Sequence, residues 1–439
     1  MQKIFGTDGV RGIFGEEITP TLAYDIGRAL ALYTKDKEKS QILIAKDTRS
    51  SGDILLTSFV SGAMSMGVFV TYMGVTTTPC LSYTTRNFGF GVGVMITASH
   101  NSYEYNGIKI FKSNGEKLGV KEEKILTKIY KSLNNFSIAP ASKCGKLLIK
   151  YNLGGKYFSY LKSLIKDKYF DFSVAFDCAN GVTYKILQKL FDNNFKNVFI
   201  INISQNPRKV NFECGATDTK SLANFVVSNN LDFGFAFDGD GDRVVMVDSQ
   251  GKLFDGDDIL YNLALYLDRK NKLKKATVVG TTMTNLGLEK ALKKEGIKLI
   301  REDVGDKYIV DRLVKDKLSL GGEKAGHIIP YEFTNTGDGV MTSLIMLNVI
   351  KKGGLTKVPE LPQVFVNIKV SKKVKEGFLS NAKINEYIEK VKSENEDIRI
   401  VVRPSGTENI IRIMVEGESY DKCQHVADEI SNFIQTNCI

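Results

Sequence analysis

One serine stands among histidine, asparagine and lysine side chains in residues 97–101 (TASHN) and 106–109 (NGIK). These residues follow the apolar run 91–96, a pattern typical of a buried strand that ends in a loop. Ser99 is a candidate nucleophile because His100 and Lys109 supply a base or a cation nearby. The chain has no G-x-S-x-G elbow and only three histidines, which favours phosphoryl transfer over acyl transfer. The competing interpretation is a serine that only caps a helix.

Three aspartates alternate with glycines at Asp238, Asp240 and Asp242. If this segment is extended, side chains two residues apart point to the same side. Clustered carboxylate oxygens suit Mg²⁺. The alternatives are a solvent-exposed acidic turn and an EF-hand loop, and the EF-hand is disfavoured because Arg243 and Ser249 occupy the positions of its glycine and glutamate.

Three further segments combine glycine with charged or hydroxyl side chains. Glu323 and His327 lie among glycines and suit the hydroxyl groups of a sugar, with a solvent-facing turn as the alternative. Arg11, in the turn-rich segment 6–12, is a candidate cation for the same site. Guanidinium and hydroxyl groups around a flexible glycine favour a phosphate over an ordinary turn, and this set comprises Arg403, Ser405, Gly406, Thr407 and Arg412.

The elements that must position these loops repeat one plan three times: strand, helix, strand, helix and a closing hairpin. We expect opening strands at 41–45, 172–176 and 276–280, second strands at 68–72, 197–201 and 297–300, and closing loops at 98–101, 238–243 and 322–327. Beyond residue 362 the pattern changes to strands at 364–368, 399–402 and 410–415, with helices near 381–392 and from about 420.

The predicted fold class is α/β: three similar α/β domains with mixed, mostly parallel sheets, and a C-terminal α+β domain around a central cleft. The expected boundaries are 1–150, 151–253, 254–362 and 363–439, and the glycine- and lysine-rich segment 145–155 is expected to be a linker.

Composition narrows the partners. The chain has 439 residues and a formal charge of +10, yet its basic runs are short and mixed with acids. We therefore expect an anionic small molecule and no nucleic acid. Six scattered cysteines form no C-x-x-C pair, and no apolar run is long enough for a membrane span. These features predict a cytoplasmic protein without a membrane partner.

Taken together, the loops resemble the α-D-phosphohexomutases over nearly the whole chain, and within that family the bacterial members that act on glucosamine phosphates. The motifs that carry this resemblance are residues 5–12, 97–101, 106–109, 214–218, 238–243, 304–306, 322–327, 336–339 and 403–412. One departure is Ala325, where the sugar loop of the family usually has serine.

The resemblance implies a role for each candidate residue. Ser99 would carry a phosphoryl group and, with Asp238, Asp240 and Asp242, hold one Mg²⁺ per chain. Lys109 would accept or donate the proton and Arg243 would stabilise the transferring charge. The remaining implied roles are the lining of the phosphoserine site by Arg11 and His100, the reading of the sugar by Glu323 and His327, and a phosphate clamp of Arg403, Ser405, Gly406, Thr407 and Arg412.

The implied reaction is the reversible conversion of glucosamine 6-phosphate to glucosamine 1-phosphate through a 1,6-bisphosphate, with sugar 1,6-bisphosphate as activator. In bacteria this isomerase reaction supplies UDP-N-acetylglucosamine and peptidoglycan precursors. The alternatives are a phosphoglucomutase or phosphomannomutase, a non-catalytic phosphosugar-binding protein, and a Mg²⁺ phosphatase, although the acidic loop lacks the D-x-D-x-[TV] order. The assembly is left open, with a homodimer as the alternative to a single chain.

Overall fold

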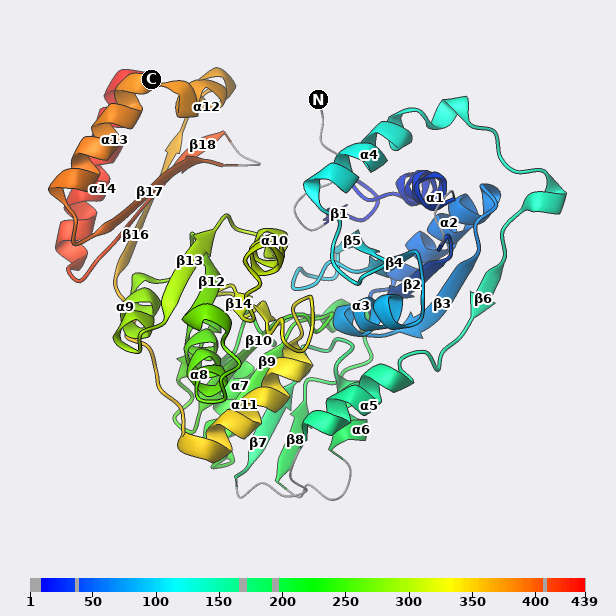
Figure 1. Ribbon diagram of the computed structural model, residues 1–439, viewed down its shortest axis with the longest axis horizontal. Helices are drawn as coiled ribbons and strands as arrows, with labels where there is room; N and C mark the ends of the chain where they lie inside the picture. The colour runs from blue at the N-terminus through cyan, green and yellow to red at the C-terminus, as the bar shows by residue number, and fades with distance from the viewer. Residues whose placement is uncertain (1–8, 36–38, 166–171, 192–196, 406–408, 439) are drawn as a thin grey trace. The chain divides into compact units, whose positions relative to one another are not determined.

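The computed structural model describes residues 9–35, 39–165, 172–191, 197–405 and 409–438. Figure 1 shows sheets flanked by helices along the chain. The chain divides into two compact units, the first comprising Met1–Thr281 and Ile300–Lys357 and the second comprising Thr282–Leu299 and Val358–Ile439.

The first sheet has six strands in the order β1-β5-β4-β2-β3-β6. Strands β2, β3, β4 and β6 run parallel to their neighbours among themselves, whereas β5 is antiparallel to both β4 and β1. Every residue of β2 and β4 is buried, as expected for strands covered on both faces. The bounds are β1 Val10–Ile13, β2 Ile42–Lys46, β3 Val70–Val75, β4 Val92–Ile96, β5 Tyr105–Lys112 and β6 Leu147–Ile149, with helices α1 Pro20–Thr34, α2 Ser51–Ser65, α3 Thr78–Asn87 and α4 Val120–Lys131.

Helices α1 and α2 pack closely against each other on this sheet. A Cβ atom on Gly27 would lie 2.2 Å from the Phe59 carbonyl oxygen, and one on Gly62 would lie 2.0 Å from that of Tyr24. Helix α1 begins where Thr19 accepts a hydrogen bond from the backbone N–H of Leu22, which satisfies one unpaired donor of its first turn. The crossing therefore requires glycine on both helices.

The second sheet has the order β11-β10-β9-β7-β8. Strands β8, β7 and β9 are parallel, and β9, β10 and β11 are joined antiparallel. Its elements are β7 Val174–Asp177, β8 Val198–Ile201, β9 Phe233–Phe237, β10 Val244–Asp248 and β11 Leu253–Phe254, with α5 Gly155–Leu164, α6 Tyr184–Leu190 and α7 Lys220–Ser228.

In the third sheet, β14 runs parallel to β12 and antiparallel to β15. Residues Thr282–Leu299, which include α9, belong to the second unit, so one boundary between the units falls within β13. Helix α8 begins with a capping box formed by Asp255 and Asp258. The bounds are β12 Thr277–Thr281, β13 Lys298–Glu302, β14 Gly321–Gly322 and β15 Ile328–Ile329, with α8 Gly256–Asp268, α9 Leu286–Lys294, α10 Asp306–Asp316 and α11 Gly339–Gly353.

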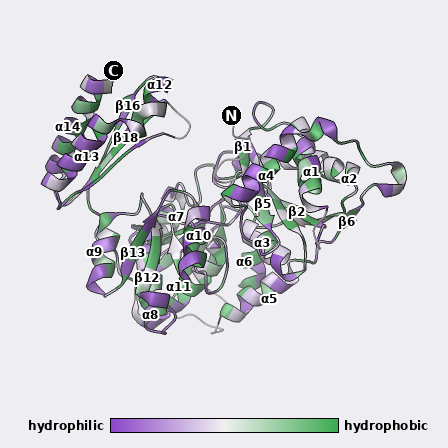
Figure 2. Ribbon diagram, turned by 45° about the horizontal axis from the view of Figure 1, so that its top comes forward, coloured by the Kyte–Doolittle hydropathy of each residue, from purple (hydrophilic) through white to green (hydrophobic). Residues whose placement is uncertain are grey.

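The second unit contains an antiparallel sheet in the order β16-β18-β17. One core joins its strands to its helices, including Ile413 from β18, Ile388 from α13 and Ile430 from α14. Figure 2 shows both hydrophobic and hydrophilic bands on these helices, as expected for helices with one buried face. The bounds are β16 Gln363–Lys369, β17 Arg399–Pro404, β18 Ile410–Glu416, α12 Lys372–Gly377, α13 Ala382–Glu394 and α14 Tyr420–Cys438.

The predicted fold class is confirmed, with mixed, mostly parallel sheets followed by an antiparallel sheet with helices. Residues 145–155 were expected to be a linker, but this segment contains β6, which pairs with β3. Residues of β6 are exposed, so backbone pairing and not apolar burial forms this strand. Among the described residues, no helix combines the length and apolarity that a bilayer span needs.

Candidate active site

Ser99 lies in the loop between β4 and β5, and its backbone adopts a left-handed conformation with φ of 52°. This region costs a non-glycine residue about 1–2 kcal/mol, so neighbouring groups must hold it there. The backbone N–H of Ser99 donates to Thr97 Oγ1 over 2.9 Å, and that hydroxyl donates to Asp47 Oδ2 over 2.7 Å. The serine is 2 % exposed.

The aspartate triad lies in the tight turn between β9 and β10. The closing loop expected at 238–243 is confirmed, but the segment is not extended, because it turns at Gly241 with a φ of 74°. The turn nevertheless gathers Asp238, Asp240 and Asp242, which are all buried and offer ligand oxygens within 4.8 Å of one another. Ser99 Oγ donates to Asp238 Oδ2 over 2.5 Å and lies 3.4 Å from Asp242 Oδ1.

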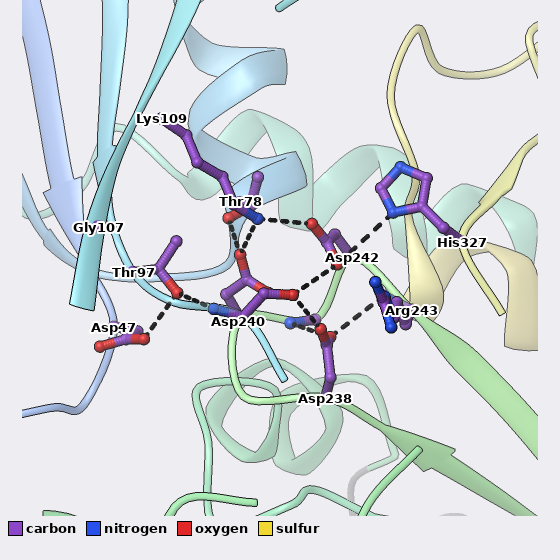
Figure 3. A network of polar contacts seen from close by, with 12 residues as sticks. Asp47, Thr78, Thr97, Gly107, Lys109, Asp238, Asp240, Asp242, Arg243 and His327 are labelled. Carbon is purple, nitrogen blue, oxygen red and sulfur yellow. Dashed lines mark hydrogen bonds and ion pairs between the residues drawn. The ribbon is translucent and has the colours of Figure 1, made fainter. Parts of the chain in front are cut away.

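Lys109 reaches the same carboxylates from β5. It pairs with Met95 across the β4–β5 hairpin, which confirms the expected hairpin. Its Nζ lies 2.9 Å from Asp240 Oδ2 and 2.8 Å from Asp242 Oδ2. Figure 3 shows Thr78, at the start of α3, pointing to the same carboxylate, and its hydroxyl donates to Asp240 Oδ2 over 2.5 Å.

Charge within the triad is unevenly distributed. Burial and the neighbouring Asp242 and Asp240 raise the pKa of Asp238 well above its usual range. Burial also opposes ionisation of Asp242, yet Lys109 and His327 hold its pKa well below the usual range. Asp240 Oδ1 is buried without a hydrogen-bond partner among the described residues. Mg²⁺ prefers oxygen ligands. The three carboxylates, one of whose oxygens receives no hydrogen bond from the described residues, therefore fit this ion.

His327, from the turn before β15, joins the triad to the start of α10. Its Nδ1 lies 3.6 Å from Asp242 Oδ1 and its Nε2 lies 3.2 Å from Asp306 Oδ2. Burial lowers the pKa of His327, but the two carboxylates outweigh it and raise that pKa to about 10. Lys117 Nζ lies 2.7 Å from Asp306 Oδ2. Carboxylates and cations therefore alternate from one loop to the next.

The other residues predicted for this site lie around the same loops. Arg11 in β1 donates from Nη1 to Asn101 Oδ1 over 3.0 Å. Burial and the cations Arg243 and Arg11 lower the pKa of His100 to about 3, so its ring is neutral at pH 7. Glu323 Oε1 accepts from the backbone N–H of Gly305 over 3.1 Å.

The structure thus brings together the three predicted loops of the first unit. Arg403 and Arg412 belong to the second unit, where they face each other across β17 and β18. Ser405 follows β17 and is 3 % exposed. Gly406 and Thr407 lie outside the described residues.

Sequence reasoning did not place Thr78 in the site. The available signal was its position directly after the second strand of the first repeat, where loops of parallel sheets carry ligands. Asp306 was noted only within a motif, and its contact with His327 depends on the tertiary fold.

Models of protein families match most of the chain. Four models match, described as phosphoglucomutase/phosphomannomutase alpha/beta/alpha domain I over residues 2–136, domain II over 155–251, domain III over 255–367 and the C-terminal domain over 365–433. The chain belongs to the α-D-phosphohexomutase family. The predicted family and enzyme class, an isomerase of the mutase type, are confirmed.

Within this family, the chain is similar in sequence to proteins named phosphoglucosamine mutases. The chain is 39% identical over 446 residues to a phosphoglucosamine mutase of Clostridium beijerinckii and 40% identical over 445 residues to that of Bacillus velezensis, and each match covers 99% of both chains. The family member is thus most similar to phosphoglucosamine mutases.

Solved structures share the fold. A phosphoglucomutase/phosphomannomutase family protein of Burkholderia thailandensis has a TM-score of 0.81 at 19% identity and covers 99% of this chain and 98% of its own. N-acetylphosphoglucosamine mutase of Aspergillus fumigatus, in complex with GlcNAc-6P and magnesium, has a TM-score of 0.68 at 18% identity and covers 99% and 96%.

Proposed function

We propose that this phosphohexomutase interconverts glucosamine 6-phosphate and glucosamine 1-phosphate. The observation that carries the proposal is the Ser99 hydroxyl, held 2.5 Å from Asp238 inside a buried carboxylate cluster. A pure binding protein would gain nothing from a nucleophile in that position. The glucosamine preference rests on the relatives, which are named phosphoglucosamine mutases at 39% and 40% identity.

Ser99, phosphorylated on Oγ, would donate its phosphoryl group to the free sugar hydroxyl. The attacking hydroxyl oxygen forms a bond to phosphorus while the bond from phosphorus to Ser99 Oγ breaks. Lys109 is placed to take the hydroxyl proton, and Arg243 to balance negative charge on the transferring oxygens. The sugar 1,6-bisphosphate so formed returns its other phosphoryl group to Ser99 after reversal, which yields the isomer.

One Mg²⁺ would be held by Asp238, Asp240, Asp242 and an oxygen on Ser99. When bound, the ion neutralises charge on the phosphoryl oxygens. The neutral ring of His100 and the guanidinium of Arg11 would line the phosphoserine site. Lys109, which pairs with Asp240 and Asp242 in this structure, would hold the proton of the attacking hydroxyl when those carboxylates hold the ion.

Substrate recognition is divided by chemistry. Glu323 would offer a carboxylate to sugar hydroxyls, and His327 would offer an imidazolium that also contacts Asp242 and Asp306. The non-reacting phosphate suits guanidinium forks and hydroxyls, and this grip is assigned to Arg403, Ser405, Gly406, Thr407 and Arg412 on that chemistry.

The deciding experiment is a mutase assay with Mg²⁺ and a trace of glucose 1,6-bisphosphate, which follows glucosamine, glucose and mannose 6-phosphates separately by phosphorus NMR. We expect the highest kcat/KM for glucosamine 6-phosphate. Ser99→Ala should lower kcat by a factor on the order of 10⁴ or more, whereas Ser113→Ala, on an exposed serine, should not change it.

Other outcomes would select the alternatives. A preference for glucose or mannose phosphate would make the protein a phosphoglucomutase or phosphomannomutase. Release of free phosphate without isomer would indicate a phosphatase, and absence of interconversion by Ser99-phosphorylated protein would indicate a binding protein. We also propose that the chain can form a homodimer, which a measurement of its mass by sedimentation tests. The cytoplasm stays the proposed compartment, supported by five free cysteines among the described residues.

A further inference from the structure

Arg49 lies completely buried beneath the loop that carries Ser99. Its Nη2 donates to the carbonyl oxygens of Ser99 and Asn101 over 3.0 and 2.7 Å. Its Nη1 donates to the carbonyls of Ser102 and Tyr105. One guanidinium group, whose planar fork is rigid, therefore binds four carbonyl groups within residues 99–105.

Asp47 fixes this arginine in turn. Its Oδ2 accepts from Arg49 Nε over 2.9 Å and also from Thr97 Oγ1 over 2.7 Å. Since Thr97 Oγ1 accepts from the backbone N–H of Ser99, the same carboxylate supports the serine from its amide side and, through Arg49, from its carbonyl side.

A second donor reaches the same two carbonyls from the second sheet region. Asn211 Nδ2 donates to the carbonyl oxygens of Ser99 and Asn101 over 2.8 and 2.9 Å. Asn211 itself has a left-handed backbone, with φ of 56°. A Cβ atom on Gly239, in the aspartate turn, would lie 2.9 Å from the Ser99 carbonyl oxygen, so the aspartate turn and the serine loop approach closely at this point.

We propose that Arg49 and Asn211 are positioning residues that fix Ser99 relative to the aspartate triad. A carbonyl oxygen has two lone pairs, and those of Ser99 and Asn101 each receive one donor from either side. Arg49, in the loop after β2, holds the carbonyls from the domain that carries the serine, and Asn211, in the segment between β8 and α7, holds them from the domain that carries the triad. Together they hold Ser99 in its left-handed conformation with Oγ next to Asp238.

This inference rests on the proposed phosphoryl transfer from Ser99. Transfer depends on in-line geometry, and a misplacement of about 1 Å can cost a factor of about 100 in rate. A purely structural role would need only one donor for each carbonyl. Donors from loops next to two different sheets instead set the distance between the nucleophile and the candidate metal ligands.

Asn211→Gly tests the proposal most cleanly, because glycine tolerates positive φ and the variant loses only the side chain. Asn230→Gly is the matched control, since Asn230 also has a left-handed backbone, with φ of 51°, and is exposed in the turn before β9. We expect Asn211→Gly to lower kcat about tenfold at unchanged KM, and Asn230→Gly to change neither. A lower Tm with unchanged kcat, or equal effects of the two variants, would overturn the role of Asn211.

Arg49→Lys tests the arginine, because a single ammonium group cannot bind four spread carbonyls. We expect kcat to fall about a hundredfold and Asp47→Asn, a milder change, to lower it severalfold. If Arg49→Lys and Asp47→Asn both keep the wild-type kcat, Arg49 has no positioning role.

A second measurement separates failure of this inference from failure of the proposed function. The rate at which Ser99 takes up a phosphoryl group from glucose 1,6-bisphosphate is followed by intact-mass spectrometry. A wild-type chain that phosphorylates Ser99 but isomerises no sugar phosphate would refute the proposed mutase, while slower uptake in Asn211→Gly would still support positioning. Equal uptake by wild type and both positioning variants would refute positioning alone.

Discussion

The site around Ser99 and the arginine pair of the second unit differ in how their charges are arranged. Around Ser99, carboxylates and cations alternate at close range, as with Lys109 between Asp240 and Asp242. In the second unit, Arg403 lies directly opposite Arg412 on neighbouring antiparallel strands. Like charges in that register destabilise a sheet, whereas alternating buried charges stabilise one another only as a complete set.

The difference suggests two ways of preparing for an anionic substrate. In the first region, Lys109 and His327 offset part of the negative charge of the aspartates. The second concentrates positive charge, and a bound phosphate would relieve the repulsion. Loss of a charge should therefore damage the first region and spare the second.

The largest expected difference comes from removing one cation from each region. Without metal, Lys109→Met leaves Asp240 and Asp242 buried beside an apolar chain, and it should lower the free energy of unfolding by about 3–5 kcal/mol. Arg403→Met should change it by less than about 1 kcal/mol. Urea unfolding with EDTA measures both. Equal losses of unfolding free energy in the two variants would contradict the proposed difference between the two regions.

Asp338 is a buried carboxylate that accepts hydrogen bonds from neutral donors and has no cation among its hydrogen-bond partners in the described part of the chain. Asp338 accepts from Tyr157 Oη over 2.8 Å and from the backbone N–H of Met341 over 2.9 Å, and burial raises its pKa to about 7 from 3.8. Between these values the folded chain binds the extra proton, so its stability falls as pH rises from about 4 to 7, by at most about 4 kcal/mol.

Asp338→Asn should remove that part of the pH dependence, because the amide remains neutral; its oxygen can accept from the Met341 N–H while its NH₂ group donates to Tyr157 Oη. Thermal unfolding measured between pH 5 and 8 checks this. The control is Asp268→Asn at an exposed carboxylate. A slope that survives in Asp338→Asn would contradict the assignment.

Metal addition should affect the first region specifically. Mg²⁺ at 100 times its Kd should stabilise the fold by about 2.7 kcal/mol, measured as a rise in Tm over a NaCl control of equal ionic strength. Asp240→Asn should reduce the rise because it removes one anionic ligand. Arg403→Met should keep it in full, and a loss there would show that the metal response does not belong to the triad.

The smallest expected effect concerns an exposed position of the sugar loop. Ala325→Ser would restore a hydroxyl beside Glu323, and one hydrogen bond contributes about 0.5–1.5 kcal/mol. We expect kcat/KM for glucosamine 6-phosphate to rise about two- to tenfold, with Ala325→Gly as the control. No change would show that position 325 does not contact the sugar.

Local pattern was sufficient for most elements. The strands expected at 41–45 and 172–176 occur as β2 and β7, shifted by one or two residues, because continuous apolar runs mark buried strands. Strand β6 was not predicted, since its exposed side chains carry no burial signal and its pairing partner β3 is distant in sequence.

The candidate site shows the same limit. Ser99 and the aspartates stand out because their motifs are local and chemically unusual. Thr78, Asp306 and Asn211 are ordinary residues in their own segments, and only their contacts with Asp240, His327 and the Ser99 carbonyl give them meaning.

The fold class and the available chemical groups follow from the amino-acid sequence, because apolar periodicity acts over short stretches of chain, and the family follows from the resemblance of its motifs. The contacts of Lys109 and His327 with the triad, and the turn that gathers its carboxylates, are visible only in the folded chain. Charge balance and the left-handed conformation of Ser99 depend on atoms from distant segments, whose distances no local pattern contains.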